Sequence, residues 1–213
     1  MGKIENGILG GFSGTVGTVV GAKWMGIDTM RSKPEPRKTP FTPAELVQQQ
    51  RFALASTFMT PMRELLAKGF KQFAIKKMGL NAAVGYAMKN AVMPEDEGYS
   101  LLCEHVLVCR GDLPPATEAI AVSDKTDQVT FHWTDDASGR GKALAADSSI
   151  LVVLCPALKT CVYTFAGAPR SAGTDTLHVH HFNGQEVMTW LSFQSVDKKD
   201  VASSIFTGQL TMP

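Results

Sequence analysis

The stretch VTFHWT, at residues 129–134, alternates bulky apolar side chains with polar ones. Successive side chains of an extended strand point to opposite faces, so Val129, Phe131 and Trp133 share one face. The polar residues between them share the other face. The pattern therefore predicts a strand that is buried on one side and meets water on the other.

Similar short runs follow this strand. SILVVLC, at residues 149–155, is apolar on both faces, which is typical of a strand in the middle of a sheet. Further runs of this type are CVYTF (161–165), TLHVHHF (176–182), VMTWLSFQ (187–194) and SSIFTGQLT (203–211). Six or seven strands over residues 99–213 predict an antiparallel β-sandwich of the immunoglobulin or fibronectin type III kind.

Helix signals precede the sandwich. Thr42, Pro43 and Glu45 form a capping box with proline at the first helical position, and this helix should run to about Met59.

Two further helices are expected after the first. One begins at Thr60 and ends near Gly79, and the other follows Asn81 and is stopped by Pro94.

These elements predict an α+β fold with two domains. Residues 1–98 would hold a glycine-rich β-hairpin, a proline-rich arm and the helices, and residues 99–213 would hold the sandwich.

Glycine dominates the N-terminal region. GILGGFSGTVGTVVGAKWMG, at residues 7–26, has seven glycines among its twenty residues. Thr15, Val16 and the β-branched residues that follow them disfavour a helix. Residues 14–31 are therefore expected to form a β-hairpin with its turn at residues 22–26.

The glycines of this hairpin leave a smooth strand that another backbone can approach closely. Either the hairpin is covered by its own molecule, or its edge pairs with a neighbouring subunit. In the second case the expected assembly interface consists of Gly10, Gly14, Val16, Gly17, Val19, Val20, Gly21 and Trp24.

A proline-rich segment follows the hairpin. RSKPEPRKTPFTP, at residues 31–43, contains four prolines and is expected to be an extended linker of polyproline II type. Its basic residues are either solvated or in contact with phosphate groups. Because no aromatic residues alternate with them, we favour a solvated arm.

The four cysteines form two pairs of equal spacing, Cys103 with Cys109 and Cys155 with Cys161. The second pair flanks a turn between two strand-like runs, where a disulfide across the hairpin could close. The alternative is two free, buried thiols in a reducing compartment. Neither pair has the short spacing with which structural zinc sites usually begin.

The sequence offers few residues for chemistry. His178 and His180 form a His-x-His pair, but a metal site would need a third ligand, for which His132 and Asp175 are the candidates. No nucleophile, acid pair or phosphate loop has the required spacing. We therefore expect no catalytic residues, no cofactor and no bound metal.

The tripeptide Arg110-Gly111-Asp112 matches a cell-adhesion sequence, but three residues carry little information. We expect it to lie in the linker that enters the sandwich.

The overall charge gives no reason to expect a strongly charged partner. Lysine and arginine total 21 against 20 acidic residues, so neither nucleic acid nor an anionic membrane is expected as a partner. No apolar run reaches the roughly 20 residues of a membrane-spanning helix. The location is left open: extracellular or at the cell surface if the protein forms filaments, otherwise cytoplasmic.

The succession of motifs resembles an uncharacterised family of Bacteroidota proteins that is catalogued as a domain of unknown function. The motifs are GILGGFSGTVGTVVGAKWMGID, MRSKP, TPAELVQQQRFALA, GLNAAVGYAMKNAV, CRGDLP, VTFHWTD and VASSIFTG. The resemblance spans nearly the whole chain. It implies a bacterial origin and a single-family architecture, and it brings no activity with it.

Two functions from different classes fit these features. The first is a non-enzymatic structural protein, a subunit of a self-assembling filament or other homopolymer held by exchange of the N-terminal strand and arm. The second is a surface binding module that recognises a glycan or protein through the loops of the sandwich. The smooth N-terminal strands and the proline-held spacer favour the first.

Overall fold

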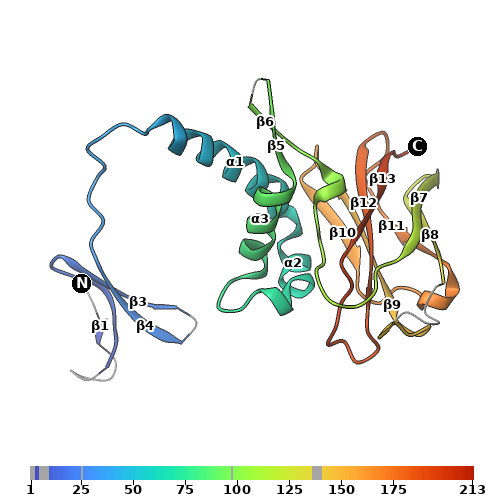
Figure 1. Ribbon diagram of the computed structural model, residues 1–213, viewed down its shortest axis with the longest axis horizontal. Coiled ribbons are helices and arrows are strands. Elements are labelled where there is room, and N and C mark those ends of the chain that lie inside the picture. Colours follow the sequence, from blue (N-terminus) through green and yellow to red (C-terminus); the bar gives the residue numbers. More distant parts are fainter. Residues whose placement is uncertain (1–2, 5–9, 25, 97, 136–140) are drawn as a thin grey trace. The chain divides into compact units, whose positions relative to one another are not determined.

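Figure 1 shows a computed structural model of the 213-residue chain, in which residues 3–4, 10–24, 26–96, 98–135 and 141–213 are described. The chain divides into two compact units, Met1–Glu45 and Leu46–Pro213. This division differs from the domain boundary expected at residues 98/99. The helices fold together with the sandwich, because they share a hydrophobic core with it.

The first unit is an antiparallel sheet with the strand order β1-β2-β3-β4. Its strands are β1 (Lys3–Ile4), β2 (Phe12–Val16), β3 (Val19–Trp24) and β4 (Ile27–Ser32). The expected single hairpin over residues 14–31 is thus divided by an additional turn at residues 17–18. Gly17 allows this turn because its φ of 58° is a conformation that glycine adopts without strain.

The second turn of this sheet is shorter than expected. Trp24 pairs directly with Ile27, so residues 22–24 belong to β3 and not to the expected turn at residues 22–26; Met25 lies outside the described residues.

The second unit contains the expected antiparallel sandwich (Figure 1). One sheet has four strands in the order β10-β9-β12-β13, and the other has three in the order β11-β8-β7. Their bounds are β7 (Thr117–Lys125), β8 (Gln128–Thr134), β9 (Ser148–Cys155), β10 (Thr160–Thr164), β11 (Thr174–His178), β12 (Glu186–Gln194) and β13 (Ile205–Thr211). The expectation of an immunoglobulin or fibronectin-like sandwich is confirmed.

The core between the two sheets follows the alternation that the sequence shows. Val129, Phe131 and Trp133 of β8 are buried, whereas His132 between them is exposed. Trp133 meets Phe193 of β12 edge to face, with the ring centroids 5.6 Å apart. Strand β9 is buried along nearly its whole length, as expected for a central strand.

Helices form a third layer on the outer face of the four-stranded sheet (Figure 1). The helical elements are α1 (Pro43–Met59), η2 (Thr60–Met62), α2 (Arg63–Gly69), η3 (Lys71–Phe73) and α3 (Gly79–Asn90). Ile150, Val152 and Leu154 of β9 point to this layer, and Trp190 of β12 meets Phe58 of α1 at 6.3 Å between centroids. Both faces of β9 are apolar because each face is covered.

The expected second helix is interrupted near its middle. It ends at Gly69, where an added Cβ would lie only 2.6 Å from the carbonyl oxygen of Val108. The third helix begins at Gly79, two residues before the expected cap at Asn81.

Pro94 lies in a strand instead of immediately ending that helix. It belongs to β5 (Val92–Glu95), which pairs with β6 (Gly98–Leu101). Short 3-10 turns, η4 (Cys103–His105) and η5 (Arg170–Ala172), complete the unit. Among the described residues, no helix combines the length and the hydropathy that crossing a membrane requires.

Candidate functional site

The expected assembly residues lie on a small sheet whose backbones approach closely. Gly14 of β2 pairs with Gly21 of β3, and Val16 pairs with Val19. A Cβ on Gly21 would overlap the ring of Phe12, so glycine is required for Phe12 to cover this point. The smoothness expected from the sequence therefore serves, at Gly21, a contact within the sheet. Gly10 lies just before β2.

The large apolar side chains of this unit are exposed. Trp24 is 52% exposed, Ile27 58%, Met30 69% and Val16 54%. Trp24 pairs with Ile27 and shares its face. Met30 pairs with Gly21, three register steps away, and therefore points to the opposite face. Both faces of the sheet therefore present apolar surface.

This sheet has almost no core of its own. Among the described residues from 10 to 45, Gly21 alone is buried. A small sheet needs a covered hydrophobic face to be stable, because its backbone hydrogen bonds alone do not offset the entropy of ordering it. The unit is thus short of burial, and a partner surface would supply what is missing.

Strand β4 provides an open edge. All six of its residues are exposed, and its hydrogen-bonded neighbour in the sheet is β3. An edge strand of this kind presents unpaired N–H and C=O groups that another strand can bind. Sequence reasoning located Trp24 but missed Ile27 and Met30.

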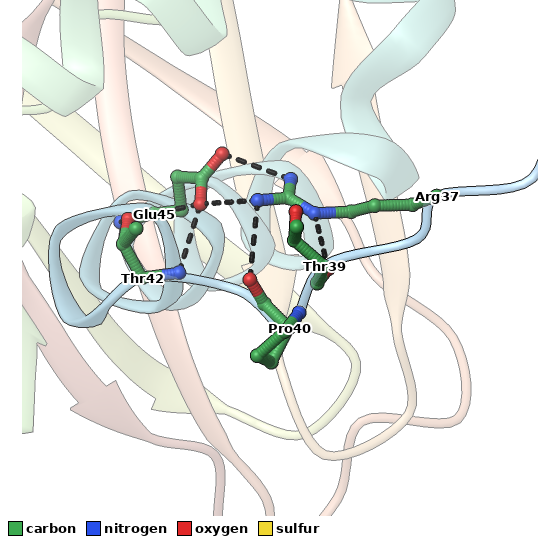
Figure 2. Close-up of polar contacts among 5 residues, drawn as sticks. All are labelled: Arg37, Thr39, Pro40, Thr42 and Glu45. Atoms are coloured by element: carbon green, nitrogen blue, oxygen red, sulfur yellow. Dashed lines mark hydrogen bonds and ion pairs between the residues drawn. The ribbon is translucent and has the colours of Figure 1, made fainter.

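The proline-rich arm is held at the start of α1 by one arginine (Figure 2). Arg37 donates through Nη1 to Oε1 of Glu45 at 2.9 Å and through Nη2 to Oε2 at 2.7 Å. Its Nε also donates to the carbonyl oxygen of Thr39 at 2.8 Å, and its guanidinium lies 4.4 Å from the centroid of Phe41. This bidentate ion pair fixes the path of residues 37–45.

The capping box is confirmed in the same contact. The backbone N–H of Thr42 donates to Oε2 of Glu45 at 2.9 Å, and the N–H of Glu45 donates to Oγ1 of Thr42 at 3.4 Å. Hydrogen bonds from Arg37 and then from Thr42 lower the pKa of Glu45 to about 2. The sequence revealed the cap but not Arg37, because its approach depends on how the prolines turn the arm.

Of the two alternatives for Cys155 and Cys161, a disulfide or free thiols, the structure has free thiols. The loop between β9 and β10 pairs Cys155 with Thr160, and Cys161 with Leu154. The two cysteines are therefore one register step apart and point to opposite faces of the sheet. Cys155 packs between the sheets, and Cys161 packs toward the helices.

The histidine candidates do not join into a metal site. His178 and His180 stack with their ring centroids 6.5 Å apart. The carboxylate of Asp175, a candidate third ligand, accepts hydrogen bonds from Ser149 and from the backbone N–H of Ala168. His132 is paired with Thr174, at the other end of β11. Over the described part of the chain, no three His, Cys, Asp or Glu side chains gather as a metal ion would require.

The Arg110-Gly111-Asp112 triplet is packed against the sandwich. A Cβ on Gly111 would overlap the carbonyl oxygen of Val201, and Arg110 stacks on Phe73. This arrangement is unlike a protruding adhesion loop.

The fold and these surfaces define a class, a fibronectin-like β-sandwich that carries a helical layer and a separate N-terminal sheet. The chain belongs to a family of unknown function, DUF6266, whose model matches residues 11–208. That match takes in both units. No curated protein matches the chain.

Among solved structures, the chain is weakly similar to the fn3 domain of the human collagen alpha-1(XX) chain. The identity is 16%, the alignment covers 46% of this chain and 86% of that domain, and the TM-score is 0.32. A likeness at this level carries no functional argument.

Proposed function

We propose that this protein is a non-enzymatic structural subunit that assembles with copies of itself into a filament or other homopolymer. The N-terminal sheet of one copy would dock on the next, with β4 as the pairing edge. One observation carries the proposal: Trp24, Ile27 and Met30 are exposed on a sheet that has almost no buried residue of its own.

The free energies favour a contact that combines apolar burial with strand pairing. Complete burial of a large apolar side chain contributes roughly 1.5–3 kcal/mol, so these three partly exposed residues contribute at most about 5–9 kcal/mol, and only if both faces of the sheet are covered. Association of two molecules costs roughly 4–15 kcal/mol in lost freedom. Apolar burial alone therefore about balances the cost. Strand pairing along β4 would supply the remainder, and assembly should depend on protein concentration.

The arm gives the sheet the reach that exchange between copies needs. Residues 33–41 form neither helix nor strand and bend at Thr39, and a polyproline-type segment of this length would span at most roughly 28 Å, at about 3 Å per residue. The Arg37–Glu45 pair would hold the end of the arm at the helix and reduce the entropy that is lost when the sheet docks. The proposal includes the bacterial, Bacteroidota origin that the sequence resemblance implies, and a location at or outside the cell surface.

The test compares the full-length protein with a variant that carries Trp24→Ser, Ile27→Ser and Met30→Ser. Size-exclusion chromatography with light scattering, over a range of concentrations, should show oligomers for the unchanged protein and monomers for the variant. Negative-stain microscopy should show repeating assemblies for the unchanged protein alone.

The matched control replaces exposed polar residues of the same strand, Asp28→Asn and Thr29→Ser, and should leave assembly intact. A full-length protein that stays monomeric at every concentration would overturn the proposal. The binding of a glycan or protein through the sandwich loops would then become the leading hypothesis.

A further inference from the structure

A groove of about 590 Å³ lies along the exposed side of α3. Its walls come from α3, from η3 with the segment that follows it, and from Arg110 in the loop that leads to the sandwich. The volume is within the range of roughly 300–1,000 Å³ that is usual for small-molecule sites. All of these elements belong to the second unit.

Three cations line the groove, Lys77, Lys89 and Arg110, and its lining contains no carboxylate. None of the three has an ion-pair partner among the described residues. A neighbouring hollow of about 350 Å³ also carries lysines, but Lys199 there pairs with Asp197 at 3.4 Å. Lys68, Lys71 and Lys198 of that hollow also have no ion-pair partner among the described residues, so what distinguishes the groove along α3 is its arginine, Arg110.

Arg110 is positioned as a recognition group would be. Its guanidinium lies 4.2 Å from the centroid of Phe73 and 5.1 Å from that of Tyr86, so two rings hold its plane in place. Its backbone N–H donates to the carbonyl oxygen of Gly69 at 2.9 Å. Within the described residues, its side chain makes no hydrogen bond. The donors of a half-buried, pre-ordered guanidinium are thus available to a ligand.

Gly85 keeps the groove open. It lies in the interior of α3, where glycine costs about 1 kcal/mol relative to alanine. An added Cβ at this position would meet nothing within 4 Å, so packing does not require glycine here. The missing side chain leaves space between Tyr86 and Lys89 on the groove wall. Glycine lowers the helix propensity of α3 at this position, and no packing contact requires it. The space that it leaves therefore points to a function of the groove.

We infer that this groove binds a small molecule that carries phosphate or carboxylate groups. Arg110 provides two parallel donors that match the oxygen pair of either group, and Lys77 and Lys89 add charge as flexible donors. Three cations without counter-ions favour a ligand with more than one negative charge. The inference does not rest on the proposed assembly, since none of these residues belongs to the N-terminal sheet.

The test is calorimetric titration of the full-length protein with pyrophosphate and with citrate at low salt, and glucose serves as the neutral control. At least one of the two anions should bind, and binding should weaken as salt is added. The stronger of the two identifies the preferred group. Absence of binding by both anions would overturn the inference.

Three variants locate the site. Arg110→Met and Arg110→Lys should each lower affinity about tenfold or more, because neither provides paired donors to an oxyanion. Gly85→Leu should block binding while circular dichroism shows a folded protein, since leucine favours a helix and its side chain extends into the groove. If Gly85→Leu binds as well as the unchanged protein, the groove is not the site.

The matched control removes lysines from the neighbouring hollow, as Lys68→Gln and Lys71→Gln, and should leave affinity unchanged. An equal loss of affinity in this control and in the double variant Lys77→Gln/Lys89→Gln would mean general attraction of the anion to a basic surface. That result would overturn the inference. The inference would also be overturned if neither anion binds and Lys89→Gln dissociates assembled copies. The groove would then be a contact with another protein molecule.

Discussion

The Nε atom of Arg170 lies 3.9 Å from the Oδ2 atom of Asp147, and both side chains are wholly buried in the sandwich. Nη2 of Arg170 donates to the carbonyl oxygen of Pro114 at 2.8 Å, and the guanidinium lies 3.8 Å from the ring centroid of Phe193. Oδ2 of Asp147 also accepts from the backbone N–H of Leu144 at 2.8 Å. This buried pair joins the segment that enters the sandwich to the loop before β9.

Arg170→Met should destabilise the protein strongly. The substitution leaves the Asp147 carboxylate buried without its cation and the Pro114 carbonyl without a donor, a loss of about 3–5 kcal/mol. Urea unfolding followed by tryptophan fluorescence measures the change. Arg63→Met, at an exposed position of α2, is the control and should cost little. A loss under about 1 kcal/mol for Arg170→Met would show that the pair is not a major source of stability.

The start of α1 should loosen in acid. The pKa of Glu45 in the folded chain is about 2, below its ordinary value of 4.5, because Arg37 and Thr42 bind the charged form. A lowered carboxyl pKa means that the contact is fully present above about pH 4.5 and is lost as the pH falls toward 2. The protection of the Thr42 amide, measured as its hydrogen-exchange rate relative to an unstructured peptide at the same pH, should fall over this range.

Glu45→Gln provides the control for that measurement. It removes the titrating group but keeps an oxygen that can accept from the Thr42 N–H, so protection at Thr42 should lack the acid-dependent step that Glu45 causes. An unchanged acid-dependent step in this variant would assign the effect to another residue.

The thiols should resist modification in the folded protein. Burial raises the pKa of Cys109 and of Cys161 to about 12, and burial together with the nearby Glu104 carboxylate raises that of Cys103 to about 11. Because the thiolate is the reactive form, alkylation by iodoacetamide at pH 7 should be slow at all three, and fast in urea. Mass spectrometry after mild oxidation should find no bond between Cys155 and Cys161. Recovery of that bond from folded protein would contradict the register.

Much of the sandwich could be predicted from the sequence because alternation has a direct physical cause, the opposite orientation of successive side chains. The same alternation could not reveal what covers β9. A strand that is apolar on both faces is equally suited to two sheets or to a sheet and helices, so the helical layer and the boundary at Glu45 were missed. The disulfide alternative for Cys155 and Cys161 arose from a similar limit of sequence patterns. Spacing does not fix the loop length, and a shift of one residue turned Cys161 away from Cys155.

The candidate sites were harder to predict because they depend on contacts between distant residues. Phe73, Tyr86 and Arg110 come from three segments, and no local pattern brings them together. Gly85 gave no signal either. A glycine within a helical pattern only weakens the prediction of a helix, and its role becomes clear only when its surroundings are known.

Two glycines of α3 should respond to alanine in opposite directions. A Cβ on Gly79 would overlap the carbonyl oxygen of Leu66 and lie 2.8 Å from the Cα of Ala67, so α2 and α3 would have to separate. Gly79→Ala should therefore cost about 1–3 kcal/mol. Gly85→Ala meets no atom within 4 Å and should stabilise the protein by up to about 1 kcal/mol, because alanine favours the helix. Thermal and urea unfolding of the two variants measure both changes. Stabilisation by Gly79→Ala would contradict the close approach of α2 to α3, and destabilisation by Gly85→Ala would contradict the open space at that position.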